Sequence, residues 1–307
     1  MRLTHLLLLS AIAAAPGAFI PGRASAAGES GFAFLKVGIG ARAMGMGGAY
    51  VAEANDPTAV YWNPAGLSGL GGTQVTFMHN EWIQDFRQDF AGVAVPAFAR
   101  GAGGIAVGLS TFYSDELERR SDTGVLLGHF GFNDLLATGS VAYPITPAFT
   151  GGLSAKYVRE MIDQENAASV AFDIGGRYVV PRTAFALAAA VQNVGTDAKF
   201  ETESFGLPRT IRVGASNEWS FATAHSGARL SGEFRKSTGE DSRVQLGGEF
   251  TYKETASLRA GYKFGYDEER ASFGLGLSRD RFTFDYALVP LSADLGSTHF
   301  FSLTARL

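Results

Sequence analysis

The 307-residue sequence has no cysteine, no basic run and, after its first 26 residues, no long apolar stretch. The absence of cysteine is compatible with an oxidising bacterial envelope compartment. Without a run of lysine or arginine, and with a formal net charge of −4, the composition gives no sign of nucleic-acid binding. Because nothing after residue 26 approaches about 18 consecutive apolar residues, a helical membrane protein is excluded. An exported soluble protein and a membrane β-barrel remain.

Histidines and recognisable catalytic motifs are also scarce. No histidine belongs to an H-E-x-x-H motif, and no G-x-S-x-G motif is present. Scattered histidines without cysteine argue against a structural metal site. We therefore predict a protein that is not an enzyme and has no cofactor. The histidines after residue 26 are His79, His129, His225 and His299.

The first 26 residues have the features of a secretory signal peptide. Arg2 precedes an apolar run from residue 6 to residue 15, and the stretch ends in the small residues Ala24-Ser25-Ala26, a pattern that signal peptidase recognises. A membrane anchor is the alternative, but the apolar run is too short and Pro16 interrupts it. We predict cleavage after Ala26, which leaves a mature chain of 281 residues (307 minus 26).

From about Thr73 onward, apolar side chains alternate with polar or small ones. Alternation with a period of two places one kind of residue on each face of a β-strand. The pattern predicts about fourteen strands, most of them near the ~9–11 residues that a tilted strand needs to cross a bilayer. One such segment has apolar Leu258, Ala260, Tyr262, Phe264 and Tyr266 on one face. The predicted strands are 73–80, 88–96, 103–113, 134–143, 150–162, 168–180, 183–194, 209–219, 227–236, 242–253, 255–266, 270–279, 281–290 and 296–307.

A soluble β-sandwich would alternate in the same way, but sandwich strands average about five or six residues, and the predicted strands are longer. Their second face combines small residues with isolated charges, for example Ser231, Glu233 and Arg235 in one strand. Such a face suits a lumen packed against an inner segment better than a surface in bulk water. We therefore predict an all-β protein, a transmembrane antiparallel β-barrel surrounded by lipid in the bacterial outer membrane.

The chain end and the connections fit the same architecture. The last segment places Phe301 and Leu303 outward, as the closing strand of an outer-membrane barrel does. Counted back from a final strand that ends at the periplasm, the long connections Ser114–Asn133 and Gly195–Pro208 lie outside the cell. Aromatic residues near strand ends are predicted to form interfacial girdles: Tyr157, Tyr178, Trp219, Tyr252, Tyr266 and Tyr286.

Residues 27–72 do not alternate. The segment is rich in glycine and alanine and then contains the pairs Asp56-Pro57 and Asn63-Pro64. Each pair predicts a helix start, with a side-chain oxygen at the N-cap and proline at the first helical position. The glycine-rich part is not followed by G-x-x-x-x-G-K, which disfavours a phosphate-binding loop. Small residues instead allow close packing against an inner wall.

The stretch GARAMGMGGAYVAEANDPTAVYWNPAGL, residues 40–67, resembles the N-terminal signature of the PorV/PorQ family within the FadL-like outer-membrane barrels. The resemblance implies a fourteen-stranded barrel formed by residues 73–307, with residues 27–72 folded inside it as a short helical plug. It also implies a ligand-binding or gating role for the plug motif. Its residues are Asn63, Pro64, Ala65, Gly66 and Leu67, the most specific part, together with Asp56 and Arg42.

Arg42 is the charged residue of the glycine-rich run. A buried arginine needs a partner, which Glu233, Glu249 or Asp285 could supply. A structural ion pair between plug and wall is favoured over contact with a substrate. The charged side chains predicted to face the lumen are Asp173, Arg177, Arg212, Glu233, Arg235, Glu249, Arg259, Lys263 and Asp285.

The resemblance implies two functions and leaves them open. PorV-like proteins act in type IX secretion, so the partners would be secretion subunits or exported proteins. FadL proteins move long-chain fatty acids, and relatives move hydrophobic aromatic compounds, so the ligand would be a hydrophobic small molecule. We expect secretion, because the front motif matches PorV/PorQ best, with transport as the alternative. An envelope enzyme is a third hypothesis, which the missing motifs disfavour.

Overall fold

The computed structural model describes residues 31–98, 103–200, 203–222, 225–292 and 294–307. The predicted signal peptide, residues 1–26, and the first residues of the predicted plug, 27–30, lie outside the described residues. Within the described ranges, no helix is both long and apolar enough to cross a membrane.

Fourteen antiparallel strands close into one barrel, in which β1 pairs with both β2 and β16. The prediction of an all-β barrel of about fourteen strands is confirmed. Two further short strands, β8 (Ala198–Phe200) and β9 (Glu203–Phe205), form a separate hairpin. The barrel strands are β1 (Gln74–Glu81), β2 (Arg87–Ala97), β3 (Gly103–Arg120), β4 (Leu126–Pro144), β5 (Phe149–Ile162), β6 (Glu165–Val179), β7 (Phe185–Gly195), β10 (Thr210–Phe221), β11 (Ser226–Ser237), β12 (Arg243–Tyr252), β13 (Ala256–Phe264), β14 (Ala271–Arg279), β15 (Phe282–Pro290) and β16 (Ser297–Arg306).

The alternating pattern separates an apolar outer wall from a polar inner wall. Phe77 is 58% exposed and Leu303 is 45% exposed, whereas their neighbours Thr76 and Ser302 are 2% and 5% exposed. Such an apolar surface is costly in water and favourable in hydrocarbon. Closure of the sheet pairs neighbouring strands all round the barrel, as a membrane-spanning sheet requires. The protein is therefore a β-barrel of the bacterial outer membrane.

Four of the predicted girdle residues lie exposed on the outer wall: Tyr157, Tyr178, Trp219 and Tyr252. A fifth, Tyr286, is half-buried and its hydroxyl is 2.8 Å from Nδ1 of His299. The prediction for Tyr266 is wrong. The strand β13 ends at Phe264, and Tyr266 follows in the connection to β14, where its hydroxyl accepts a hydrogen bond from the inward-facing Arg235.

The two ends of the barrel sequence meet at one rim, where the N–H of Leu307 donates to the carbonyl oxygen of Thr73. This rim also carries the short connections 253–255 and 280–281. Outer-membrane barrels keep such short turns on the periplasmic side. The opposite, extracellular rim carries the longer connection 196–209, which contains β8 and β9.

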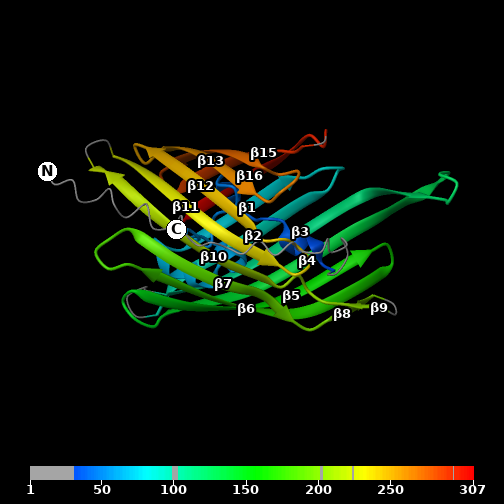
Figure 1. Ribbon diagram of the computed structural model, residues 1–307, viewed down its shortest axis with the longest axis horizontal. Helices are drawn as coiled ribbons and strands as arrows, with labels where there is room; N and C mark the ends of the chain where they lie inside the picture. Colours follow the sequence, from blue (N-terminus) through cyan, green and yellow to red (C-terminus); the bar gives the residue numbers. More distant parts are fainter. Residues whose placement is uncertain (1–30, 99–102, 201–202, 223–224, 293) are drawn as a thin grey trace.

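The segment Ser114–Asn133 is a long hairpin and not the predicted loop. β3 and β4 remain paired from Gly104↔Ala142 to Arg120↔Leu126, with irregular register after Ser114 and Arg119. The hairpin extends far beyond the neighbouring strands at the end of the barrel opposite the C-terminus (Figure 1). Polar residues in this part mask the strand pattern, because outside the membrane neither face needs to be apolar.

Four short helices of the N-terminal segment pack against the inner wall. They are η1 (Ala33–Lys36), α1 (Ala41–Gly45), α2 (Ala59–Trp62) and η2 (Pro64–Gly69). The contact with the wall is close at Gly261 of β13, where a Cβ atom would lie 2.1 Å from the backbone nitrogen of Gly47. Glycine is required at this position because a larger residue would push the helical segment off the wall.

The two predicted helix starts differ. Asn63 caps η2, with its side-chain oxygen accepting from the N–H of Ala65 at 3.1 Å. Asp56 is not the residue before α2, which is Thr58. Instead Asp56 accepts hydrogen bonds from both the N–H and the hydroxyl of Thr58, so it stabilises the turn that leads into the helix.

Candidate functional site

Arg42 joins the N-terminal segment to the barrel wall. Its Nε lies 3.0 Å from Oε2 of Glu249, and its Nη2 donates to Oε1 of the same carboxylate at 3.1 Å. The third nitrogen, Nη1, donates to the hydroxyl of Tyr50 and to the side-chain oxygen of Asn55. Burial opposes the charge of Arg42, but Glu249, Tyr50 and Glu53 outweigh this effect and raise the pKa of Arg42. The guanidinium is therefore held in a charged, bidentate contact.

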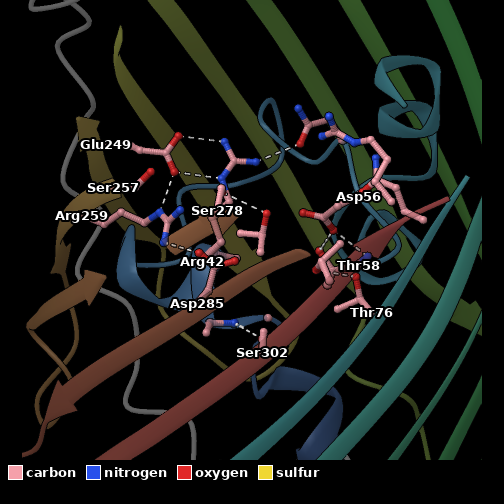
Figure 2. Close-up of a pocket in the computed structure, with 18 of the residues that line it drawn as sticks. Arg42, Asp56, Thr58, Thr76, Glu249, Ser257, Arg259, Ser278, Asp285 and Ser302 are labelled. Atoms are coloured by element: carbon pink, nitrogen blue, oxygen red, sulfur yellow. Dashed lines mark hydrogen bonds and ion pairs between the residues drawn. The ribbon is translucent and has the colours of Figure 1, made fainter. Parts of the chain in front are cut away.

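Of the three carboxylates predicted as partners of Arg42, Glu249 is the one in contact. Glu249 also accepts from Nε of Arg259 at 2.6 Å, and Nη1 of Arg259 reaches Asp285 at 2.7 Å. Figure 2 shows Arg42 and Arg259 both directed at Glu249, with Asp285 beyond Arg259. Because each carboxylate has an arginine within 3 Å, this network carries no unpaired charge.

Glu233, the third candidate, holds a different part of the segment. Its Oε2 accepts from the backbone N–H groups of Tyr50 and Val51 at 3.0 and 2.8 Å, and its Oε1 pairs with Arg212 at 2.5 Å. The guanidinium of Arg212 lies 4.8 Å from the ring centre of Trp62. One inward carboxylate thus fixes the turn between α1 and α2.

The NPAGL motif packs against β3, β4, β5 and β6. Asn63 is fully buried, and its Nδ2 donates to the carbonyl oxygens of Val51 and Gly176. A Cβ atom on Gly66 would meet the carbonyl oxygen of Ala54 at 2.0 Å. Pro64 and Ala65 face Gly152 closely, and Leu67 is fully buried. The motif therefore shapes the packing of the segment against the wall.

All nine charged residues predicted for the lumen face inward. Eight are at most 7% exposed, and Arg177 donates from Nε to the carbonyl oxygen of Ala52. Sequence reasoning missed further inward charges, among them Lys156, which pairs with Asp173 at 2.6 Å. Lys156 stands between two apolar chain neighbours, so the alternating pattern could have identified it as an inward residue.

A polar cavity of about 310 Å³ lies in the periplasmic half of the lumen, next to Arg42. Hydroxyl groups from the periplasmic ends of the strands line it, including Thr76, Ser257 and Ser302 (Figure 2). Such a lining holds water and offers little to an apolar ligand.

A second cavity, of about 200 Å³, lies in the extracellular half. Five basic side chains line it, together with the acidic Asp267, Glu268 and Glu269. Three cations share one carboxylate there: Oε1 of Glu240 is 3.1 Å from Lys36, and Oε2 is 3.5 Å from both Arg235 and Arg243. Among the described residues, Nε of Arg235 and Nε of Arg243 have no hydrogen-bond partner, and Nη2 of Arg235 has only the 3.5 Å ion pair with Glu240. We call this space, with Lys36, Arg235 and Arg243 around Glu240, the basic cavity.

Tyr266 completes the basic cavity. Its hydroxyl accepts from Nη1 of Arg235 at 3.1 Å, and the guanidinium of Arg243 lies 4.1 Å from its ring centre. Burial favours the neutral phenol, but Arg235 and Lys263 outweigh it and lower the pKa of Tyr266. The basic side chains around Tyr266 thus favour a negative charge on its phenol oxygen.

Aromatic side chains cluster at the extracellular mouth beside the basic cavity. Phe86 stacks on Phe112 with ring centres 5.4 Å apart, and Phe132 meets both rings edge-on. Trp82 from the connection 82–86 packs on Phe112 at 6.4 Å. We call these four residues the mouth aromatic cluster. It has no counterpart in the sequence predictions, because its members are scattered over one connection and two strands.

Comparison with known proteins agrees with this fold. Residues 9–158 match an uncharacterised protein family (UPF0164), and comparison with curated proteins finds no match. Among solved structures, the chain is similar to the CymD monoaromatic hydrocarbon channel, with a TM-score of 0.59 and 13% identity over 88% of this chain and 98% of that chain. The fold is that of a FadL-like outer-membrane channel.

Two further structures of the same type are similar to this FadL-like barrel. The toluene transporter TodX of Pseudomonas putida has a TM-score of 0.56 and 12% identity over 87% of this chain and 96% of that chain. A FadL homologue of Pseudomonas aeruginosa has a TM-score of 0.52 and 13% identity over 86% and 97%. At such low identity the likeness concerns the fold, and the assignment to PorV/PorQ stays a prediction.

Within the part of the chain that the structure describes, no group of three or more histidine, cysteine, aspartate or glutamate side chains is placed to hold a metal ion.

Proposed function

We propose that this FadL-like barrel conducts hydrophobic small molecules with an anionic head group, such as long-chain fatty acids, across the outer membrane. The observation that carries the proposal is the position of the mouth aromatic cluster beside the basic cavity. Trp82 lines the basic cavity and also packs on Phe112 of the cluster. An apolar chain and a carboxylate could therefore be bound together.

The charges of the basic cavity favour an anion. Lys36, Arg235 and Arg243 share the carboxylate of Glu240, and arginine N–H groups without partners are costly when buried. A carboxylate would accept hydrogen bonds from them in the planar geometry that guanidinium groups prefer. A neutral hydrocarbon would gain nothing from these groups.

In this proposal the segment 27–72 is the plug that controls passage. Arg42, Asn63 and the backbone of Tyr50 and Val51 tie it to inward side chains or carbonyl groups of the wall. The plug lies between the basic cavity and the periplasmic cavity, since its residues line both. A bound ligand must therefore displace part of the plug to cross.

Uptake measurements test the proposal. The full chain, expressed in a bacterial host that lacks its own fatty-acid transporter, should restore uptake of a radiolabelled long-chain fatty acid. The double variant Arg235→Ala, Arg243→Ala should lower that uptake about tenfold, the equivalent of one lost charge-assisted hydrogen bond. Uptake of the fatty alcohol of equal length should not change.

Arg279→Ala is the control, because Arg279 is exposed at the periplasmic turn, away from the basic cavity, and the variant should leave fatty-acid uptake unchanged. Absence of fatty-acid uptake by the parent chain would refute the proposal. The secretion hypothesis predicts a different result, in which secretion subunits or exported proteins copurify with the chain from its native membrane and uptake does not depend on it.

A further inference from the structure

The first described residues of the plug cross the extracellular mouth and are held by carboxylates at both ends. The N–H of Phe32 donates to Oε2 of Glu160 at 3.0 Å. One turn later, Nζ of Lys36 pairs with Oε1 of Glu240 at 3.1 Å. The ring of Phe32 is fully buried and packs on Phe205 of β9 with ring centres 5.6 Å apart. We call residues 32–36 the mouth strap.

Glu160 stands directly opposite Asp134 in the pairing of β4 and β5. Asp134 is fully buried, and in the described part of the chain neither of its oxygens has a hydrogen-bond partner. Its register partner on β3 is Phe112 of the mouth aromatic cluster. A carboxyl group in such surroundings is stable only if it is neutral, because a buried unpaired charge is very costly.

Two charged groups near this pair are bound elsewhere, and a third lies on the other face of the strand. On β5, Lys156 pairs with Asp173 at 2.6 Å. Arg159, the chain neighbour of Glu160, follows the opposite face, and among the described residues its buried Nε has no hydrogen-bond partner. On the mouth strap, Lys36 is held by Glu240. The N–H of Met161 faces Asp134 without completing a hydrogen bond to it.

We propose that Asp134 and Glu160 form a proton-dependent latch that keeps the mouth strap closed. This regulation rests on the proposed function, since it controls access to the basic cavity. When the two carboxyl groups share one proton, the remaining negative charge on Glu160 is held by the N–H of Phe32. When both ionise, like charges face each other directly across the strands. Water must then enter, and Phe32 separates from Glu160, so the mouth opens as the pH rises.

Cysteine labelling tests the latch in the full chain, which has no cysteine of its own. Leu35→Cys places a thiol at a buried position of the mouth strap, and Ala33→Cys places one at an exposed position. The ratio of their maleimide labelling rates in lipid vesicles cancels the pH dependence of thiol reactivity. This ratio should rise about tenfold or more between about pH 6 and about pH 9. Each pH unit above the pKa that the ionising carboxyl group has in the open form shifts the opening equilibrium by up to about tenfold.

In the Asp134→Asn background this ratio should stay at its low-pH value throughout. Glu160→Gln, which keeps an acceptor for Phe32, should have the same effect. Asp163→Asn is the matched control, because it removes a carboxylate that is exposed and paired with Arg119 on the same side of the barrel; its profile should equal that of the parent.

A flat ratio in the parent chain would overturn the latch, and so would an unchanged profile in a folded Asp134→Asn variant. Heat-dependent migration on gels verifies that each variant forms the barrel. Because labelling is measured without any ligand, its failure leaves the uptake results standing. Conversely, loss of the proposed transport function with an intact labelling profile would leave the latch in place.

Discussion

The side chain of Asn63 makes three hydrogen bonds from a fully buried position in the N-terminal segment. Its side-chain oxygen accepts from the N–H of Ala65, and its amide donates to the carbonyl oxygens of Val51 and Gly176. The NPAGL motif, which carries the resemblance to the PorV/PorQ signature, therefore has a physical role at Asn63. Its side chain starts η2 and ties two other segments to this helix.

We expect Asn63→Ala to lower the free energy of unfolding by about 2–3 kcal/mol. About 1 kcal/mol is the loss of the helix cap, and the rest is the cost of carbonyl oxygens left without a donor. Urea unfolding in lipid vesicles measures the change. Asn63→Ser, which keeps the cap but not the amide, should recover about 1 kcal/mol. Equal stability of the two variants would show that the cap contributes nothing.

At the scale of elements, the connection between β11 and β12 attaches to the mouth strap through Glu240. Burial alone would raise the pKa of this carboxyl, but Arg235, Arg243 and Lys36 outweigh burial and lower it below the ordinary 4.5. A carboxyl whose pKa is lower in the folded than in the unfolded chain stabilises the fold above the unfolded value. That contribution is lost as the pH falls through the folded pKa.

We therefore expect the parent chain to lose stability relative to Glu240→Gln as the pH is lowered below about 4.5. Urea midpoints of both proteins, measured from about pH 7 to about pH 3, should converge at the acidic end. The comparison removes the contribution of all other carboxyl groups, because both proteins contain them. A constant difference across this range would contradict the assigned charge partners of Glu240.

At the scale of the whole molecule, the structure is a closed wall with a helical segment tied inside. The network of Arg42, Glu249 and Arg259 joins α1 to β12 and β13, while Glu233 holds the turn after α1. Because the lumen is divided into a basic and a hydroxyl-lined cavity, we expect the conductance of the barrel to depend on whether the proposed plug stays in place.

We expect deletion of residues 27–72 to raise the single-channel conductance in planar bilayers, because we propose that this segment obstructs the lumen as a plug. Arg42→Ala keeps the plug but removes its bidentate contact with Glu249, so it should produce frequent openings of intermediate size. Arg279→Ala is a suitable control, since Arg279 is exposed at the periplasmic turn. Unchanged conductance in both test variants would contradict the plug proposal.

Much of the barrel could be predicted because alternation is local. The apolar residues of each strand mark the face that meets lipid. In the last strand, exposed Phe301 beside buried Ser302 is enough to show which face is which. Predictions from alternation are wrong where the membrane no longer constrains the chain. Beyond the bilayer, β3 and β4 continue as polar strands through Ser114–Asn133, and Tyr266 leaves the face that its spacing predicted.

Partners across the lumen could not be predicted in the same way. The sequence indicated that Arg42 needs a carboxylate and named three, but Glu249 is separated from it by 207 residues. Which carboxylate is close enough depends on how the plug packs on the wall, for example on the contact of Gly47 with Gly261. Likewise, Asp134 and Glu160 become a pair only through the register of β4 with β5.

The sequence by itself determined the barrel, its strand number and its two faces, because lipid outside and polar side chains inside impose a period of two on every spanning strand. The tertiary structure alone decided which charges meet, where the two cavities lie and how the mouth is closed. These depend on distances between residues far apart in the chain, which hydrogen-bond register and packing set and no local pattern records.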